Sequence, residues 1–285
     1  MGKAQDFGSG KGPRNENFPV ASFLMRREHR DITRAFYNFA RAADDVADHP
    51  SAPGEQKLEI LDGMRQALLG KGGDDLSAIV LRSHILEHGI GFDHPLDLLK
   101  AFRIDVIQSR YSDWDALLDY CMLSAAPVGR FVLDVHGESR ALWQASDALC
   151  NALQIINHLQ DCSADYRNLD RIYIPLESFE GAGLSPDVLG AAEAPAPLRM
   201  VITGLAARAG DLLEAGRPLI YELKDRRLAL EVAVIHRLAE SLIGMLRTRD
   251  PLSQKIHHGR ARFMGLCLAG AAQGLLGRLW PRRAG

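Results

Sequence analysis

Helical periodicity runs through almost the whole chain and is the feature that most constrains its fold. No stretch shows the sustained alternation of apolar and polar residues that a half-buried strand requires. The sequence therefore predicts an all-α protein. Clusters of proline, glycine and small residues near 49–54, 70–73, 89–95 and 181–197 interrupt the pattern. Between them we expect helical segments, several of them subdivided, at 27–48, 55–69, 75–88, 96–137, 141–166, 198–248 and 256–280.

The domain organisation follows from the breaks. None of them resembles a long flexible linker, and no repeat of fixed period is present, so we predict one compact helical domain at 16–285. A chain of 285 residues is long enough to bury a sizeable core. The polar, Gly/Lys-rich start predicts a disordered segment at 1–15 without the apolar centre of a signal peptide.

Charge and cysteine usage narrow the classes of partner. The 34 Lys and Arg residues nearly balance the 36 Asp and Glu residues, which argues against a nucleic-acid partner. The four cysteines form no CxxC pair, so we expect neither a disulfide framework nor a thiolate zinc site, and we expect a cytoplasmic location. The apolar stretch 263–280 is interrupted by Gln273 and Arg278. It favours a terminal helix packed on the domain over an interfacial membrane helix.

Two helical segments carry stripes of aspartate. Because successive residues turn by about 100°, residues three and four apart share one face of a helix. In the segment 36–48 that face holds Tyr37, Arg41, Asp44 and Asp48. In the segment 154–165 it holds Gln154, Asn157, Asp161 and Asp165. Each stripe therefore presents two carboxylates one turn apart, with apolar residues on the opposite side.

The stripes have a structural and a functional interpretation. Solvated helix faces are common, but they usually pair Glu with Lys, and Asp and Asn are poor helix formers. Neither stripe has a lysine, and the second has no cation. Oxygen ligands without Cys or His favour a hard ion such as Mg²⁺, which binds through carboxylates, waters and substrate phosphates. We therefore expect Mg²⁺ to join the two stripes to a diphosphate, with Arg41 and Arg171 taking the remaining phosphate charge.

The chain resembles the squalene/phytoene synthase family of head-to-head trans-isoprenyl diphosphate synthases. The segment 44–48 resembles the first aspartate motif of that family, and 154–165 resembles the second. The segments 120–129 and 171–175 are also similar, and the likeness spans roughly residues 15 to 260. It implies the isoprenoid-synthase helical bundle, with both aspartate motifs facing a central cavity.

The resemblance also implies roles for individual residues. The metal ligands would be Asp44, Asp48, Asn157, Asp161 and Asp165. The catalytic set would comprise the four aspartates together with Tyr37 and Tyr120. The substrate contacts would be Asn17, Phe18, Arg41, Ala125, Val128, Gly129, Gln154, Asn157, Arg171 and Tyr173. Pro127 is expected to kink its helix. For His158 a hydrogen-bonded structural role is favoured over catalysis.

Within the family, the segments 16–22, 127–130, 159–162 and 165–171 look like the bacterial hydroxysqualene synthase branch of hopanoid biosynthesis. This likeness implies that presqualene diphosphate is ionised and that water captures the rearranged cation. Gln160 stands where condensing relatives often have Arg, which weakens the alternative of a prenyltransferase that joins two prenyl diphosphates. A non-catalytic helical assembly factor is the alternative from another class. The hydrocarbon substrate and product lead us to expect peripheral membrane contact and a downstream redox enzyme as partner.

Overall fold

The computed structural model describes residues 27–279, which are helical apart from loops and one isolated bridge between Arg110 and Ile172. The predicted all-α fold is confirmed. The α-helices are α1 (Arg27–Ala47), α2 (Gly54–Leu69), α3 (Leu76–His88), α4 (Asp93–Ile107), α5 (Trp114–Ser124), α6 (Ala126–Val135), α7 (Trp143–Leu169), α8 (Leu176–Gly181), α9 (Ala196–Gly216), α10 (Leu219–Glu222), α11 (Arg226–Leu246) and α12 (Arg260–Leu279). The segment 1–15 lies outside the described residues, and the single domain at 16–285 stays a prediction.

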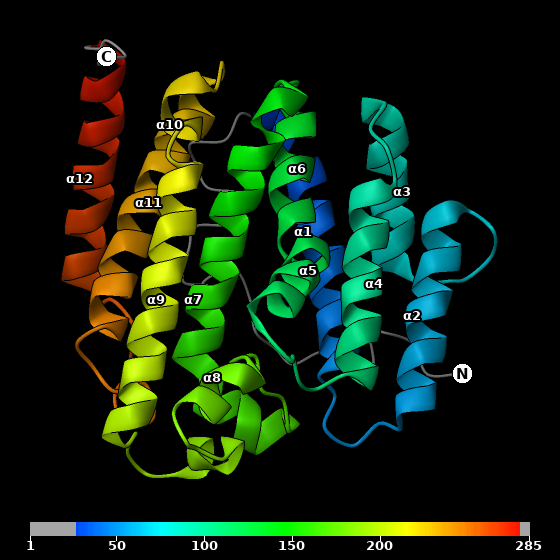
Figure 1. The fold of residues 1–285 in the computed structure, drawn as a ribbon. Helices are drawn as coiled ribbons and strands as arrows, with labels where there is room; N and C mark the ends of the chain where they lie inside the picture. Colours follow the sequence, from blue (N-terminus) through cyan, green and yellow to red (C-terminus); the bar gives the residue numbers. More distant parts are fainter. Residues whose placement is uncertain (1–26, 280–285) are drawn as a thin grey trace.

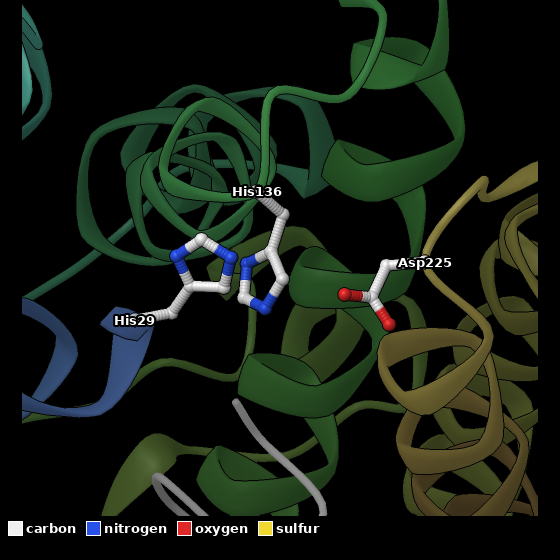
Figure 2. A group of neighbouring side chains, drawn as sticks. All are labelled: His29, His136 and Asp225. Atoms are coloured by element: carbon white, nitrogen blue, oxygen red, sulfur yellow. The ribbon is translucent and has the colours of Figure 1, made fainter. Parts of the chain in front are cut away.

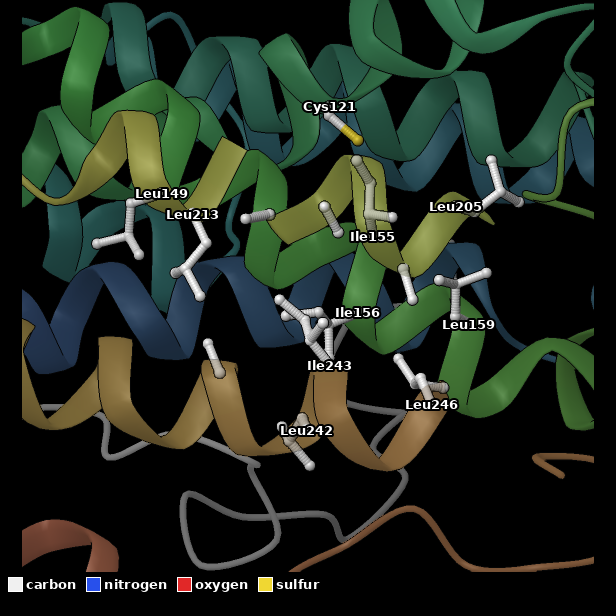
Figure 3. Close-up of a cluster of buried hydrophobic side chains, with 14 of the residues drawn as sticks. Cys121, Leu149, Ile155, Ile156, Leu159, Leu205, Leu213, Leu242, Ile243 and Leu246 are labelled. Atoms are coloured by element: carbon white, nitrogen blue, oxygen red, sulfur yellow. The ribbon is translucent and has the colours of Figure 1, made fainter. Parts of the chain in front are cut away.

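The helices form two packed groups that meet along α5 and α6 (Figure 1). In one group α1 packs against α2, α3 and α4 over a core that includes Phe36, Phe39 and Phe131. In the other group α7 packs against α9 and α11. Figure 3 shows the apolar side of α7, where Ile156 belongs to the same buried cluster as Ile243 of α11. The polar stripe of α7 is thereby left to face the first group.

Two of the long predicted segments are subdivided. The segment 96–137 contains α4, α5 and α6, and the chain bends at Ala125, where the backbone leaves the helical range. Pro127 follows in the first turn of α6, where its missing N–H is tolerated, so the helix breaks just before the proline and does not kink at it. The segment 198–248 divides into α9, α10 and α11. Asp225 begins α11 by accepting the backbone N–H groups of Arg227 and Leu228.

A polar junction joins the two groups of helices near the start of α1. Figure 2 shows His29 of α1, His136 at the end of α6 and Asp225 before α11 converging on one point. The two imidazole centroids are 4.3 Å apart, and Nδ1 of His136 lies 2.8 Å from the Val132 carbonyl oxygen. Three segments that are far apart in sequence are thus held together at one end of the bundle.

The terminal apolar stretch forms α12, which packs along α11 (Figure 1). Its glycines permit this close approach: a Cβ on Gly270 would lie 2.8 Å from Cα of Val234. The packed helix expected here is found as far as Leu279. By length and hydropathy alone, one stretch of the described residues, Trp114–Val135, would suffice to cross a membrane. It comprises α5 and α6, which pack against α4 and α7.

Candidate active site

A cavity of about 530 Å³ lies between α1, α4, α5 and α7 and is also lined by the loop that follows α7. Five of its lining side chains are carboxylates, from Asp44, Asp48, Asp105, Asp161 and Asp165. Two arginines line it as well, Arg41 and Arg171. The volume is in the range of small-molecule sites, which is typically 300–1,000 Å³. The described residues thus place an excess of acidic groups around one internal space.

The first aspartate stripe faces this cavity as its helical spacing predicted. Tyr37, Arg41, Asp44 and Asp48 all line the space, whereas Phe39 of the same helix is fully buried in the core. The guanidinium of Arg41 lies 2.8 Å from Oδ2 of Asp44 and 2.6 Å from Oδ1 of Asp45. Arg41 therefore orients the first carboxylate of the stripe from within its own helix.

The second stripe faces the same cavity from α7. Gln154, Asn157, Asp161 and Asp165 all line it, and Ile155, Ile156 and Leu159 are buried on the other side of the helix. The helix α7 is therefore amphipathic, with one face in the core and the other on the cavity. The structure brings together the two stripes that the sequence could place only on separate helices. Their roles as ligands stay a prediction.

The loop after α7 carries Arg171 and Tyr173 to the cavity. Asp170 ends α7 with a positive φ of 50°, a conformation that Asp tolerates better than most residues. The chain then pairs with the loop after α4, where the N–H of Ile172 donates to the Ser109 carbonyl at 2.9 Å. Arg171 is held against α1, because its Nη1 donates to Asp48 and its Nη2 to the Ala47 carbonyl.

The electrostatics of the cavity fit a divalent cation. Burial, followed by repulsion from Asp48, raises the pKa of Asp44 to about 7 in spite of the neighbouring Arg41. Five carboxylates against two guanidiniums leave negative charge that the lining arginines do not balance. The lining includes no cysteine, and the carboxylates and the amides of Gln154 and Asn157 offer oxygen. Such a donor set suits a hard divalent ion.

A second part of the cavity is aromatic and contains a carboxylate that sequence reasoning missed. Asp105 of α4 accepts hydrogen bonds from the hydroxyl of Tyr120 at 2.9 Å and from that of Tyr173 at 3.1 Å. Burial raises the pKa of Asp105 to about 6. The sequence signal for Asp105 is an acidic residue near the end of an apolar helical segment. A buried tyrosine hydroxyl needs a hydrogen-bond partner, and such a carboxylate can be that partner.

His158 lies beside this group as a neutral ring. It stacks on Tyr173 with ring centroids 3.6 Å apart, and its Nε2 lies 3.2 Å from the amide nitrogen of Gln154. Burial, followed by repulsion from Arg171, lowers the pKa of His158 to about 3. A neutral ring that accepts a hydrogen bond agrees with the structural role favoured from sequence.

Some predicted substrate contacts do not reach the cavity lining formed by the described residues. Ala125 is buried at the α5–α6 bend, and Val128 is 40% exposed on α6. Gly129 allows α6 to approach α7, because a Cβ there would lie 2.3 Å from Oγ of Ser146 and 2.6 Å from Sγ of Cys150. The roles of these three positions as substrate contacts stay a prediction. Asn17 and Phe18 lie outside the described residues.

His257 also lines the cavity, and sequence reasoning did not find it. Its placement follows from a contact of the preceding residue, because the side-chain amide of Gln160 on α7 donates to the backbone carbonyl of Ile256. Gln160 is buried and does not line the cavity itself. No local pattern around His257 indicates this position, since it depends on how the α11–α12 loop lies over α7.

Comparison with known proteins gives consistent matches. The family model described as squalene/phytoene synthase matches residues 13–262. The chain is 52% identical over 257 residues to the hydroxysqualene synthase of Rhodopseudomonas palustris, covering 90% of this chain and 88% of that protein. It is 52% identical over 266 residues to that of Zymomonas mobilis, covering 93% and 90%. The crystal structure of squalene synthase HpnC from Alicyclobacillus acidocaldarius superposes with a TM-score of 0.72 at 30% identity, covering 86% of this chain and 91% of that chain.

Proposed function

Because this chain belongs to the squalene/phytoene synthase family, we propose that it is a hydroxysqualene synthase, which converts presqualene diphosphate and water to hydroxysqualene and diphosphate. The likeness to two relatives of that name, over nearly the full length of each, is the observation that carries the proposal. The enzyme breaks the bond between carbon and the diphosphate oxygen, and both bonding electrons leave with the diphosphate. Water then forms the new C–O bond and loses a proton.

Members of the family use a divalent metal ion, and the oxygen-rich lining leads us to propose Mg²⁺. Asp44, Asp48, Asn157, Asp161 and Asp165 would hold it. When bound, the ion would supply positive charge to the departing diphosphate. The excess of carboxylates over arginines in the lining supports this assignment.

The protein's own cations support the departure of the diphosphate. Arg171 uses Nη1 and Nη2 to hold Asp48 and the Ala47 carbonyl, and a guanidinium has five N–H donors in all. The remaining donors of Arg171, together with Arg41 and the hydroxyl of Tyr37, would bind phosphate oxygens. Arginines that are already fixed by aspartates lose little conformational freedom when they bind the anion.

The aromatic part of the cavity suits the cation that remains. Tyr120, Tyr173 and Phe102 line it, and the faces of aromatic rings attract positive charge. His158 adds a neutral ring that does not repel the cation at cellular pH. The acidic part and the aromatic part therefore suit the two fragments that ionisation produces.

The test is incubation of the purified protein with presqualene diphosphate and Mg²⁺ in H₂¹⁸O, without a reductant. We expect hydroxysqualene that carries the ¹⁸O label, because water attacks carbon. An unlabelled alcohol would mean that a P–O bond was cleaved, and triterpene products free of hydroxysqualene would reject the proposal. Farnesyl diphosphate given alone should be left unchanged. Its conversion to presqualene diphosphate, squalene or phytoene would identify a condensing prenyltransferase instead.

We extend the proposal to a cytoplasmic protein that contacts the membrane surface and passes its product to a redox enzyme. Exposed apolar side chains on α12 support the membrane contact; they are Met264, Leu268, Leu275 and Leu276. Co-flotation with liposomes that is lost in the double variant Leu268→Ser/Leu275→Ser would support this contact. Wild-type protein that stays in the lower fractions would contradict it.

A further inference from the structure

Asp105 is a partly buried carboxylate that lines the cavity but belongs to neither aspartate stripe. Its two oxygens are shared between two tyrosines, since Oδ2 accepts from the Tyr120 hydroxyl and Oδ1 accepts from the Tyr173 hydroxyl. The three residues come from α4, α5 and the loop after α7. An internal carboxylate with two phenol donors fixes the direction of both hydroxyl protons.

The direction of those protons determines what the tyrosines offer to the cavity. Each O–H bond points toward Asp105, so the lone pairs of each phenol oxygen point elsewhere. Tyr120 and Tyr173 both line the cavity, and their ring centroids are 5.6 Å apart. A water molecule in this part of the cavity would therefore donate hydrogen bonds to the phenol oxygens. Its own lone pair would be left to face the substrate.

We propose that Asp105 is the positioning residue for water capture, orienting Tyr120 and Tyr173 to hold the attacking water and receiving its proton through one of them. This inference rests on the proposed hydroxysqualene synthase activity. Water donates an electron pair to the carbocation and becomes an oxonium. One proton then passes from the oxonium to a phenol oxygen while that phenol passes its own proton to the Asp105 carboxylate. The alcohol is left neutral and Asp105 is protonated, so charge and atoms balance.

The surroundings of Asp105 suit this step. A proton acceptor works best when its pKa lies near the operating pH. Burial raises the pKa of Asp105 to about 6, with Arg171 and the two tyrosine hydrogen bonds opposing that rise and Asp48 adding to it. The pKa values of Tyr120 and Tyr173 are raised well above the usual range, chiefly by burial, so both phenols stay protonated. A neutral phenol can relay a proton without holding one.

Asp105→Asn is the sharpest test, because the side chain keeps its shape and changes its hydrogen bonding. The amide oxygen can accept from one tyrosine, but the amide nitrogen must donate to the other and turn that hydroxyl proton toward the cavity. We expect the ratio of hydroxysqualene to hydrocarbon products, formed by proton loss from the cation, to fall about tenfold. Consumption of presqualene diphosphate should fall less, since ionisation does not involve Asp105.

Tyr111→Phe is the matched control. Tyr111 belongs to the same aromatic group, with its ring centroid 5.1 Å from that of Tyr120, and its hydroxyl has no hydrogen-bond partner among the described residues. Its product ratio should equal that of the wild type. Tyr120→Phe and Tyr173→Phe should each shift the ratio in the same direction as Asp105→Asn. They test the relay even where Asp105→Asn does not fold.

The outcomes separate this inference from the function on which it rests. A folded Asp105→Asn variant with the wild-type product ratio would overturn the inference while the wild type still makes hydroxysqualene. The same holds if neither tyrosine variant shifts the ratio. In the double variant Asp105→Asn/Tyr173→Phe the effects on the product ratio should be less than additive, because each substitution alone already disrupts the same relay. A wild-type protein that makes no alcohol would remove the proposed function and this inference together.

Discussion

Two charged clusters of this molecule have opposite charge balance. Between α9 and α11, Glu240 meets Arg217 at 2.9 Å, Arg237 at 2.9 Å and His236 at 3.3 Å, and Arg217 also pairs with Glu214. There two carboxylates face two guanidiniums. In the cavity five carboxylates face two. A cluster that balances its own charge needs no further ion, whereas an unbalanced one is suited to bind a cation from solution.

The pKa shifts of the two clusters agree with this difference. The Arg217 hydrogen bond lowers the pKa of Glu214, so that carboxyl is stabilised in its charged form. Burial raises the pKa of Asp44 to about 7 and that of Asp105 to about 6, so those carboxyls are destabilised when charged. We infer that the α9–α11 cluster contributes to folding and that the cavity cluster is maintained for binding and chemistry.

The largest effect that this comparison predicts is on turnover. Asp161→Asn should lower the rate with presqualene diphosphate by about a thousandfold or more, because a proposed metal ligand is lost where charge develops. Helicity and the midpoint of thermal unfolding should remain close to those of the wild type. Product analysis together with circular dichroism measures both quantities. Wild-type turnover in this variant would refute the assignment of Asp161.

In the metal-free protein, the contribution of two cavity carboxyls to stability should fall as the pH rises. The folded-state pKa values of Asp44 and Asp105 lie above the unfolded value of 3.8, so these two carboxyls bind more protons in the folded chain between about pH 4 and 7. That contribution to stability is present at low pH and is lost through this window.

Saturating Mg²⁺ should reverse the loss, since it favours the ionised carboxylates. We expect the unfolding midpoint to rise by about 5 °C at pH 8, and by less at pH 5. Differential scanning fluorimetry with and without EDTA measures this, and Asp161→Asn serves as the control. An equal gain in both proteins would contradict the proposed ligand.

A smaller effect, on stability alone, is expected in the α9–α11 cluster, whose charges balance. Glu240→Gln should lower the free energy of unfolding by about 1–2 kcal/mol, because Arg217 and Arg237 lose a charged partner that is only partly exposed. Turnover should stay within about twofold of the wild type. Urea unfolding and a product assay check the two halves of this prediction. A large loss of activity in a folded variant would contradict the inference that the α9–α11 cluster contributes to folding and the cavity cluster to binding and chemistry.

The smallest effect is expected at Tyr111. Its hydroxyl is buried and has no hydrogen-bond partner among the described residues, so Tyr111→Phe should stabilise the protein by up to about 1 kcal/mol. Urea unfolding would measure the change. Destabilisation by a similar amount would show that the hydroxyl has a partner, such as an ordered water.

The two aspartate stripes were predictable because helical spacing alone fixes which residues share a face. The apolar sides of α1 and α7 had to enter the core, so Asp44 and Asp161 had to face elsewhere. Asp105 was missed because it forms no stripe. Its hydrogen-bond partners are tyrosines 15 and 68 positions away in the sequence. Gly129, which is predicted to contact the substrate, lies where α6 closely approaches Ser146 of α7, and only the structure shows this packing.

The amino-acid pattern by itself determined the helices, the sides of them that are buried and the acidic character of the remaining sides, because these follow from local geometry and from the removal of apolar surface from water. Only the tertiary structure decided that α1 and α7 turn their acidic sides to one cavity. It also decided that Arg171 is held against Asp48 and that Asp105 sits between two phenols. Those contacts join residues from separate segments, and side-chain packing across the bundle sets them, which no local periodicity encodes.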